Sequence, residues 1–159
     1  RMDEEATKLM MSEFSLSDAV LDTAEPFKAV AQAKDKKLEI NVDEGISYVG
    51  DEKAIRQLIS ILLDNAMKYS ESSISITLKT SGRNRMITVW NTVDESANIK
   101  KGRQDILFER FYRADPSHNS KTGGFGIGLS AAYAIVRAHK GKISARSEDG
   151  RSIEFMIVL

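Results

Sequence analysis

Three residues near the end of one predicted helix carry groups that could bind a nucleotide. They are Asn65, Lys68 and Tyr69, within the segment 52–69. Asn65 and Lys68 are three positions apart and therefore neighbours on a helix surface. An amide oxygen is a hard ligand for Mg²⁺, an ammonium pairs with phosphate, and an aromatic ring offers apolar contact. Considered alone, the same residues fit an ordinary polar helix flank with an interfacial Tyr better, because Asn and Lys are common on protein surfaces.

A glycine-rich segment opens a second predicted helix. Residues 123–130 read GGFGIGLS. Glycines let the backbone approach a ligand closely, and a helix N-terminus favours phosphate. The segment is no P-loop, because no Gly-Lys-Ser/Thr follows, and no strand precedes it as a dinucleotide-binding unit requires. It indicates a phosphate site, and a flexible loop before a glycine-rich helix start is the alternative.

The helix over 52–69 has the clearest periodic pattern in the chain. Asp51 is its predicted cap, and apolar residues recur along it at helical spacing. They are Ile55, Leu58, Ile59, Leu62, Leu63 and Ala66. This stripe predicts a helix packed on a core, with Asn65 and Lys68 on its flank.

The remaining elements mix helices with strands that are adjacent in sequence. Helices are expected from Ser17 or Asp18 to about Lys34, over 104–112 and over 128–139. Strands are expected over 38–42, 73–79, 85–91, 142–147 and 152–159, and a loop over 114–125. This order favours an α/β fold, a two-layer sandwich with helices packed on one face of a mixed, mainly antiparallel sheet.

Length and composition fit one globular domain. The chain has 159 residues, with 23 Lys plus Arg against 23 Asp plus Glu, so nothing supports a nucleic-acid partner. It has no cysteine and only two histidines, which excludes thiolate metal sites and disfavours an imidazole one. No apolar run is long enough to span a membrane, and the chain itself is not expected to bind one.

Three motifs occur in an order and spacing that resemble sensor histidine kinases. LLDNAMKYS at 62–70 resembles their N box, FERFYR at 108–113 their F box, and GFGIGLS at 124–130 their G2 box. The resemblance covers essentially residues 12–159. It implies a Bergerat-type ATP-binding fold, shared with gyrase-type and ninety-kilodalton chaperone ATPases. It also implies a histidine protein kinase domain that supplies the γ-phosphoryl group of ATP to a histidine on a separate dimerisation domain.

The resemblance also assigns roles to residues of these boxes. Asn65 would coordinate Mg²⁺ between the phosphates, Lys68 would contact phosphate, and Tyr69 would lie against the nucleotide. Residues 114–125 would form an ATP lid with Arg113 at its base, and the F box would help to anchor it. The nucleotide-binding residues expected in this way are Asn65, Lys68, Tyr69, Asn91, Ile99, Phe108, Arg113, Gly124, Phe125, Gly126, Ile127, Gly128 and Leu129.

Several positions depart from the family pattern. Ile61 stands where the first Asn of the N box is usual, and an isoleucine cannot ligate Mg²⁺ or act as the general base of a gyrase-type hydrolase. Asn91 stands where an Asp usually accepts from the adenine amino group, so that bond would be neutral and weaker. Val93 and Glu95 replace two glycines, and Ile153 replaces a Thr near the adenine. The changes at Asn91, Val93, Glu95 and Ile153 predict an affinity for nucleotide below the family's usual range.

Neither histidine is expected to accept the phosphoryl group. The family's acceptor lies in a helix with an acidic residue just after it, whereas His118 precedes Asn119 and His139 precedes Lys140. Both are expected to be exposed loop or cap residues, so the chain should bind nucleotide without phosphorylating itself.

Several readings of the whole chain stay open at this point. Residues 1–13 are expected to be a helical remnant of a preceding segment, and 14–159 the catalytic domain. The expected partners are ATP or ADP, the dimerisation domain and a response regulator, with the domain cytoplasmic in a membrane sensor. A degenerate module that docks to proteins is the main alternative. An anti-sigma-factor type serine kinase is a further one, disfavoured by the F box.

Overall fold

The computed structural model describes residues 8–94, 101–103 and 125–159. The helices are α2 (Leu16–Ala33), α3 (Glu52–Tyr69) and α5 (Phe125–Ala138). The strands are β1 (Ser12–Ser15), β2 (Lys37–Val42), β3 (Ser47–Gly50), β4 (Ser73–Ser81), β5 (Asn84–Thr92), β6 (Gly102–Arg103), β7 (Lys142–Ser147) and β8 (Ser152–Val158). The helix over 52–69 and the five expected strands are confirmed, with small differences at their ends.

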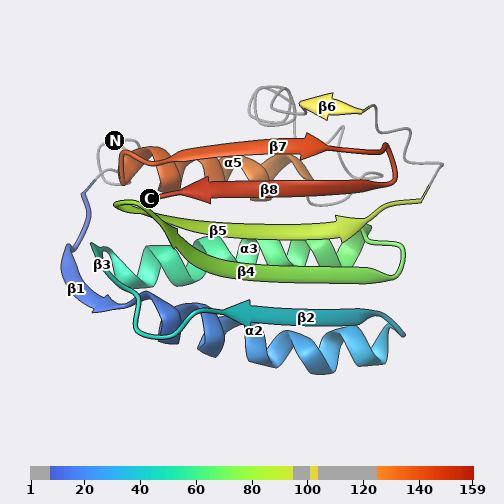
Figure 1. The fold of residues 1–159 in the computed structure, drawn as a ribbon, viewed down its shortest axis with the longest axis horizontal. Coiled ribbons are helices and arrows are strands. Elements are labelled where there is room, and N and C mark those ends of the chain that lie inside the picture. Colours follow the sequence, from blue (N-terminus) through green and yellow to red (C-terminus); the bar gives the residue numbers. More distant parts are fainter. Residues whose placement is uncertain (1–7, 95–100, 104–124) are drawn as a thin grey trace.

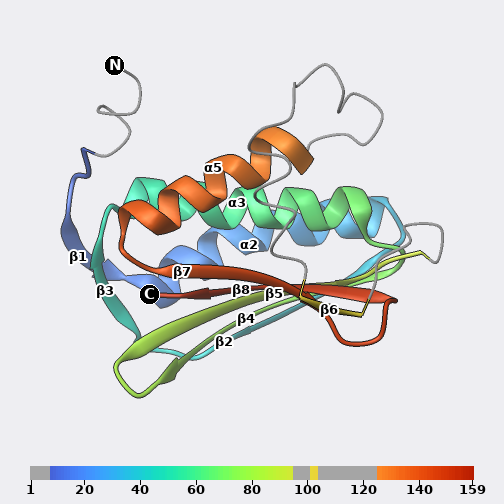
Figure 2. The same cartoon turned by 90° about the horizontal axis from the view of Figure 1, so that it is seen from above.

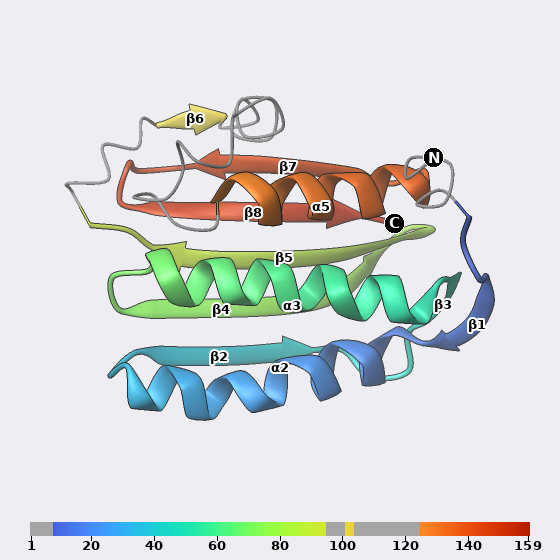
Figure 3. The same ribbon diagram turned by 180° about the vertical axis from the view of Figure 1, so that it is seen from behind.

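The larger sheet has the strand order β2-β4-β5-β8-β7-β6. Its β2–β4 pair is parallel, and its other pairs are antiparallel. Figures 1 and 2 show the described helices gathered on one face of this sheet, and Figure 3 shows α3 over β4 and β5 and α5 over β7 and β8. The predicted fold class, a two-layer α/β sandwich with a mixed and mainly antiparallel sheet, is confirmed.

The core forms between the helices and the inward face of the sheet. The predicted stripe of α3 is buried at every position, with at most 1% exposure. Alternate residues of the strands meet it, as the two-residue period of a strand requires. They include Ile74, Ile76, Leu78, Ile87, Val89, Phe155 and Ile157. Among the described residues, no helix combines the length and apolar character that crossing a membrane would require.

A short ribbon of β1 and β3 lies beside the start of α3. Its strands pair antiparallel, and Phe14 packs edge-on against Tyr48 with ring centroids 6.1 Å apart. Residues 8–11 are in neither helix nor strand, and Ser12 and Glu13 belong to β1. The expectation of a helix reaching residue 13 is therefore wrong over the described residues, because the ribbon's strand pairing fixes an extended backbone there.

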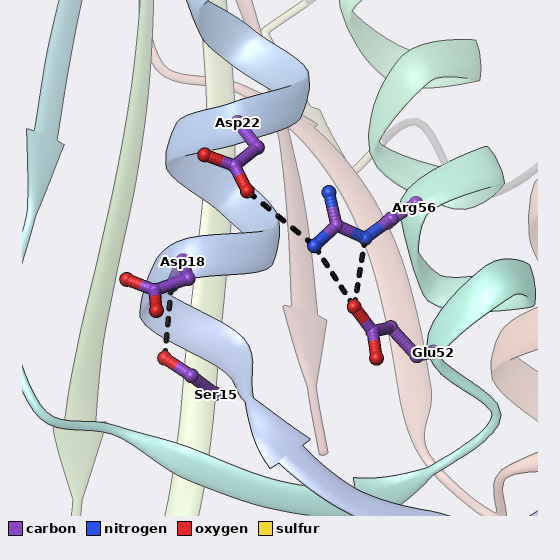
Figure 4. Close-up of polar contacts among 5 residues, drawn as sticks. All are labelled: Ser15, Asp18, Asp22, Glu52 and Arg56. Carbon is purple, nitrogen blue, oxygen red and sulfur yellow. Dashed lines mark hydrogen bonds and ion pairs between the residues drawn. The ribbon is translucent and has the colours of Figure 1, made fainter.

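Helix α2 begins earlier than predicted, because a different side chain caps it. Ser15 is the cap, and its Oγ accepts the backbone N–H of Asp18 at 3.1 Å (Figure 4). Ser17 instead lies buried and holds the turn before β3. Its hydroxyl donates to the carbonyl of Asp43 at 2.6 Å and accepts from the N–H of Ile46 at 3.0 Å.

An ion-pair cluster joins α2 to α3 at the surface. The guanidinium of Arg56 lies 2.8 Å from the carboxylate of Glu52, one turn earlier in α3, and 3.5 Å from that of Asp22 in α2 (Figure 4). Because these side chains are partly exposed, each pair contributes only about 0–1 kcal/mol. The burial of apolar side chains, rather than these charges, therefore holds α2 against α3.

Helix α5 begins at Phe125, three residues before the expected start, and a specific contact follows its end. His139 Nε2 accepts the N–H of Asp51, the cap of α3, at 3.1 Å, while Nδ1 donates to the carbonyl of Ile135 at 2.8 Å. The expectation that His139 is merely an exposed cap residue is therefore wrong. Its ring fixes the end of α5 against the start of α3.

Candidate functional site

The two helices that carry the predicted site, α3 and α5, run antiparallel (Figure 3). His139 meets Asp51 at one end of the pair. Toward the other end, a Cβ added to Gly128 would lie 3.5 Å from Cγ2 of Ile61. The start of α5 therefore lies directly against the turn of α3 that precedes Asn65. The structure thus brings the N-box helix and Gly128 of the glycine-rich segment together.

Asn65 differs from its polar neighbours in being buried. Its side chain is 7% exposed, although it stands one position away from exposed Asp64. The helical count places it beside the apolar stripe, on the side of Ile61, which is itself half-buried and packed against the core. A buried amide beside an aliphatic side chain provides one oxygen for a cation, with no second ligand from Ile61.

Lys68 extends the polar flank of α3 into solvent. Its ammonium lies 3.4 Å from the carboxylate of Asp64, one turn earlier, and both side chains are about half exposed. Such a pair contributes about 0–1 kcal/mol, so a polyphosphate with more negative charge could compete for the ammonium. Tyr69 follows at the last position of α3 and is half-buried.

The predicted base end of the site lies at the ends of two neighbouring strands. Asn91 in β5 is the direct cross-strand partner of Ile153 in β8, and both are buried. The amide nitrogen of Asn91 donates to the carbonyl of Thr92 at 2.8 Å. This bond orients the amide, so that its oxygen is the group left to accept a hydrogen bond from a ligand.

Thr92 connects this base end to the end of α3. Its carbonyl accepts the N–H of Glu71 at 3.0 Å, and its hydroxyl oxygen accepts the N–H groups of Ser72 and Ser73, each at 3.0 Å. The chain that leaves α3 is therefore fixed to the residue next to Asn91. Sequence reasoning missed Thr92, because a threonine at the end of a strand has no signal that distinguishes it from any other.

The structure describes only part of the predicted site. Asn65, Lys68 and Tyr69 lie in the last turns of α3, Gly128 packs against Ile61 one turn before Asn65, and Leu129 is buried in α5. Asn91 lies near the end of β5, and residues 125–127 form the first turn of α5. The predicted site residues that lie outside the described residues are Ile99, Phe108, Arg113 and Gly124. The predicted helix over 104–112, nearly all of the predicted lid, Glu95 and His118 also lie outside them.

A metal at this site would depend on the ligand as well as the protein. Within the described ranges, no group of three or more His, Cys, Asp or Glu side chains could hold a metal ion. Mg²⁺ commonly binds proteins through one or two side chains together with substrate phosphates and water. The single amide oxygen of Asn65 fits that arrangement. It does not fit a site in which the protein supplies all the metal ligands.

Comparison with known proteins agrees with this geometry. Residues 50–159 match the family described as histidine kinase-, DNA gyrase B-, and HSP90-like ATPase. The chain is 37% identical over 150 residues to sensor protein DltS of Streptococcus agalactiae serotype V, covering 93% of this chain and 37% of DltS.

Solved structures share the fold at lower identity. The nucleotide-free catalytic domain of histidine kinase ThkA superposes with a TM-score of 0.77 at 21% identity, covering 95% of both chains. Full-length ShkA in complex with AMPPNP superposes with a TM-score of 0.73 at 20% identity, covering 98% of this chain and 34% of ShkA. The chain therefore belongs to the family of histidine kinase-, DNA gyrase B- and HSP90-like ATPases, and it is the kind of domain from this family that sensor histidine kinases contain.

Proposed function

We propose that the chain is the ATP-binding catalytic domain of a two-component sensor histidine kinase. It binds ATP with Mg²⁺ and presents the γ-phosphoryl group to a histidine on a separate dimerisation domain. The observation that carries this proposal is the packing of Gly128, in the glycine-rich start of α5, against Ile61, one turn before Asn65 in α3. Lys68 follows Asn65 on α3, and Asn91 is buried near the end of β5. The complex of ShkA with AMPPNP supports it as an analogy.

In this proposal, some residues stabilise the charge of the phosphates and others orient the nucleotide. When bound, Mg²⁺ would neutralise phosphate charge, and Asn65 would hold it. Lys68 would bind phosphate, and the N–H groups at the start of α5 would meet phosphate oxygens. Asn91 would accept from the amino group of adenine. Phosphoryl transfer depends mainly on such positioning and charge stabilisation.

The wider setting of the domain is part of the same proposal. The chain spans little more than a third of the length of DltS. We propose that residues 14–159 form the catalytic domain and that residues 1–13 come from a preceding segment, although strand pairing places Ser12 and Glu13 with the ribbon. The expected partners are the dimerisation domain and a response regulator, with the domain on the cytoplasmic side of a membrane sensor.

Calorimetric titration of ATP and ADP, with and without Mg²⁺, tests the proposal. Saturable binding that Mg²⁺ strengthens, with no histidine phosphorylation of the chain itself, is expected. The neutral Asn91 and the apolar Ile153 at the base end favour weak binding, with a dissociation constant above the micromolar range. Failure of folded protein to bind at millimolar nucleotide would favour the second candidate, a degenerate module that docks to proteins.

An Asn91→Asp substitution tests the base end separately. It should strengthen ATP binding by roughly fivefold, because a charged acceptor forms a stronger hydrogen bond with the adenine amino group. The same change should lower the unfolding temperature without ligand, because it removes the donor to Thr92 and places a carboxylate beside that carbonyl, where the amide now lies 2.8 Å away. Calorimetry and thermal unfolding measure the two effects.

Asn84→Asp is the matched control for this substitution. Asn84 begins β5 at the opposite end of the strand and is exposed. Its replacement should change neither property. Unchanged or weaker ATP binding by the Asn91→Asp protein would show that Asn91 does not contact the base.

A further inference from the structure

A lysine outside every motif of the sequence reaches the last turn of α3. Helix α2 ends in a tight turn, with Asp35 at φ 60° and the N–H of Lys36 bonded to the carbonyl of Ala31 at 2.8 Å. This is the pattern of a Schellman motif, and it fixes where the Lys36 backbone lies. The side chain then crosses to α3, where its Nζ donates to the carbonyls of Met67 at 2.7 Å and Ser70 at 2.8 Å.

These two carbonyls need a partner because the helix ends there. In a continuing helix, the carbonyl of Met67 would accept the N–H of Glu71. That N–H instead donates to the carbonyl of Thr92, 3.0 Å away. The ammonium of Lys36 replaces the missing helical donor, and a positive charge at a helix C-terminus is also favoured by the helix dipole.

The ammonium occupies this position at some cost in solvation. Lys36 is half-buried, and burial lowers the pKa of its ammonium, with the charge of Lys34 lowering it further. The two hydrogen bonds to the carbonyls of Met67 and Ser70 offset the lost hydration of the ammonium. Lys36 therefore differs from the neighbouring lysines Lys34 and Lys37, which are exposed.

We propose that Lys36 is a positioning residue for nucleotide binding. Its ammonium fixes the last turn of α3, which carries Lys68 and Tyr69, and so sets these two residues relative to Asn91. The chain that leaves α3 is bonded to Thr92, next to Asn91, through Glu71, Ser72 and Ser73, and Lys36 holds the turn just before these residues. This role rests on the proposed ATP binding.

The first test compares Lys36→Met with Lys36→Arg. Methionine keeps an apolar stem of similar length but has no donor, whereas arginine can still donate to both carbonyls. The Lys36→Met protein should bind MgATP about fivefold to tenfold more weakly, as expected for the loss of a charge-assisted contact. Lys36→Arg should restore most of the affinity, and the exposed control Lys37→Met should bind as the unmodified chain does.

A double-mutant cycle with Lys68→Met separates positioning from general stability. If Lys36 acts through Lys68, then Lys36→Met should weaken MgATP binding less than about twofold in the Lys68→Met background, while lowering the unfolding temperature as before. Calorimetry is performed where all variants are folded.

Two other outcomes would contradict the role. A lower unfolding temperature with unchanged MgATP affinity for Lys36→Met would make Lys36 purely structural, and so would full additivity in the cycle. Absence of nucleotide binding by the unmodified chain would instead overturn the proposed function, and this role with it.

Discussion

Replacing Asn65 with alanine is expected to weaken MgATP binding by roughly 10- to 100-fold. Loss of a residue that merely hydrogen-bonds to a metal ligand commonly lowers metal affinity by that factor, and Asn65 is the predicted ligand itself. Asn65 is the only metal ligand predicted in the chain, and Ile61 beside it offers no oxygen. Alanine keeps helix α3 intact, because it is the best helix former. The substitution should therefore weaken ligand binding without unfolding the helix.

Chelation provides the measurement that isolates the metal. Removing Mg²⁺ with EDTA should weaken ATP binding to the unmodified chain strongly and to the Asn65→Ala chain only slightly. Asn65→Asp, which keeps an oxygen ligand, should retain the dependence on Mg²⁺. Asn41→Ala, in the exposed part of β2, is the control and should behave as the unmodified chain. Equal MgATP affinity for Asn65→Ala would remove Asn65 from the site.

The parts of the fold that were predictable are those with a long periodic pattern. Helix α3 and the β4–β5 hairpin follow from regular spacing of apolar residues over many positions. An extended piece was predicted over 14–16, but β3 and its pairing with β1 were missed, because a strand of four residues has too few positions to show alternation. The parallel pairing of β2 with β4 depends on contacts between distant segments, which the local pattern does not contain.

The sequence proposes candidate site residues where the residue type itself suggests chemistry. Asn65, Lys68 and the glycine-rich segment were proposed from their residue types together with the order of the three boxes. Asn91 and Ile153, both assigned to the base end, are cross-strand partners. Lys36, Thr92 and His139 could not be identified, because each acts through a backbone group distant in sequence. A lysine in a turn has the same sequence signal whether it faces solvent or completes a helix end.

The largest expected effect on stability belongs to Phe155 in the centre of β8. Its side chain is 1% exposed, and its cross-strand partners are Val89 in β5 and Ala145 in β7. The small Ala145 leaves room for the ring on the inward face. Phe155→Ala should lower the free energy of unfolding by about 3–5 kcal/mol, because it removes buried apolar surface and leaves a cavity that rigid strands cannot close.

The neighbouring Met156 supplies the matched control, because successive residues of a strand point to opposite faces of the sheet. Met156 is half-buried and lies in register with Thr88 and Ser144, on the face that the described helices leave open (Figure 2). In urea unfolding, Met156→Ala should lower the free energy by less than about 1.5 kcal/mol. Equal losses for the two variants would mean that the second face is also covered in solution, since only burial on both sides can make neighbouring strand positions equally sensitive.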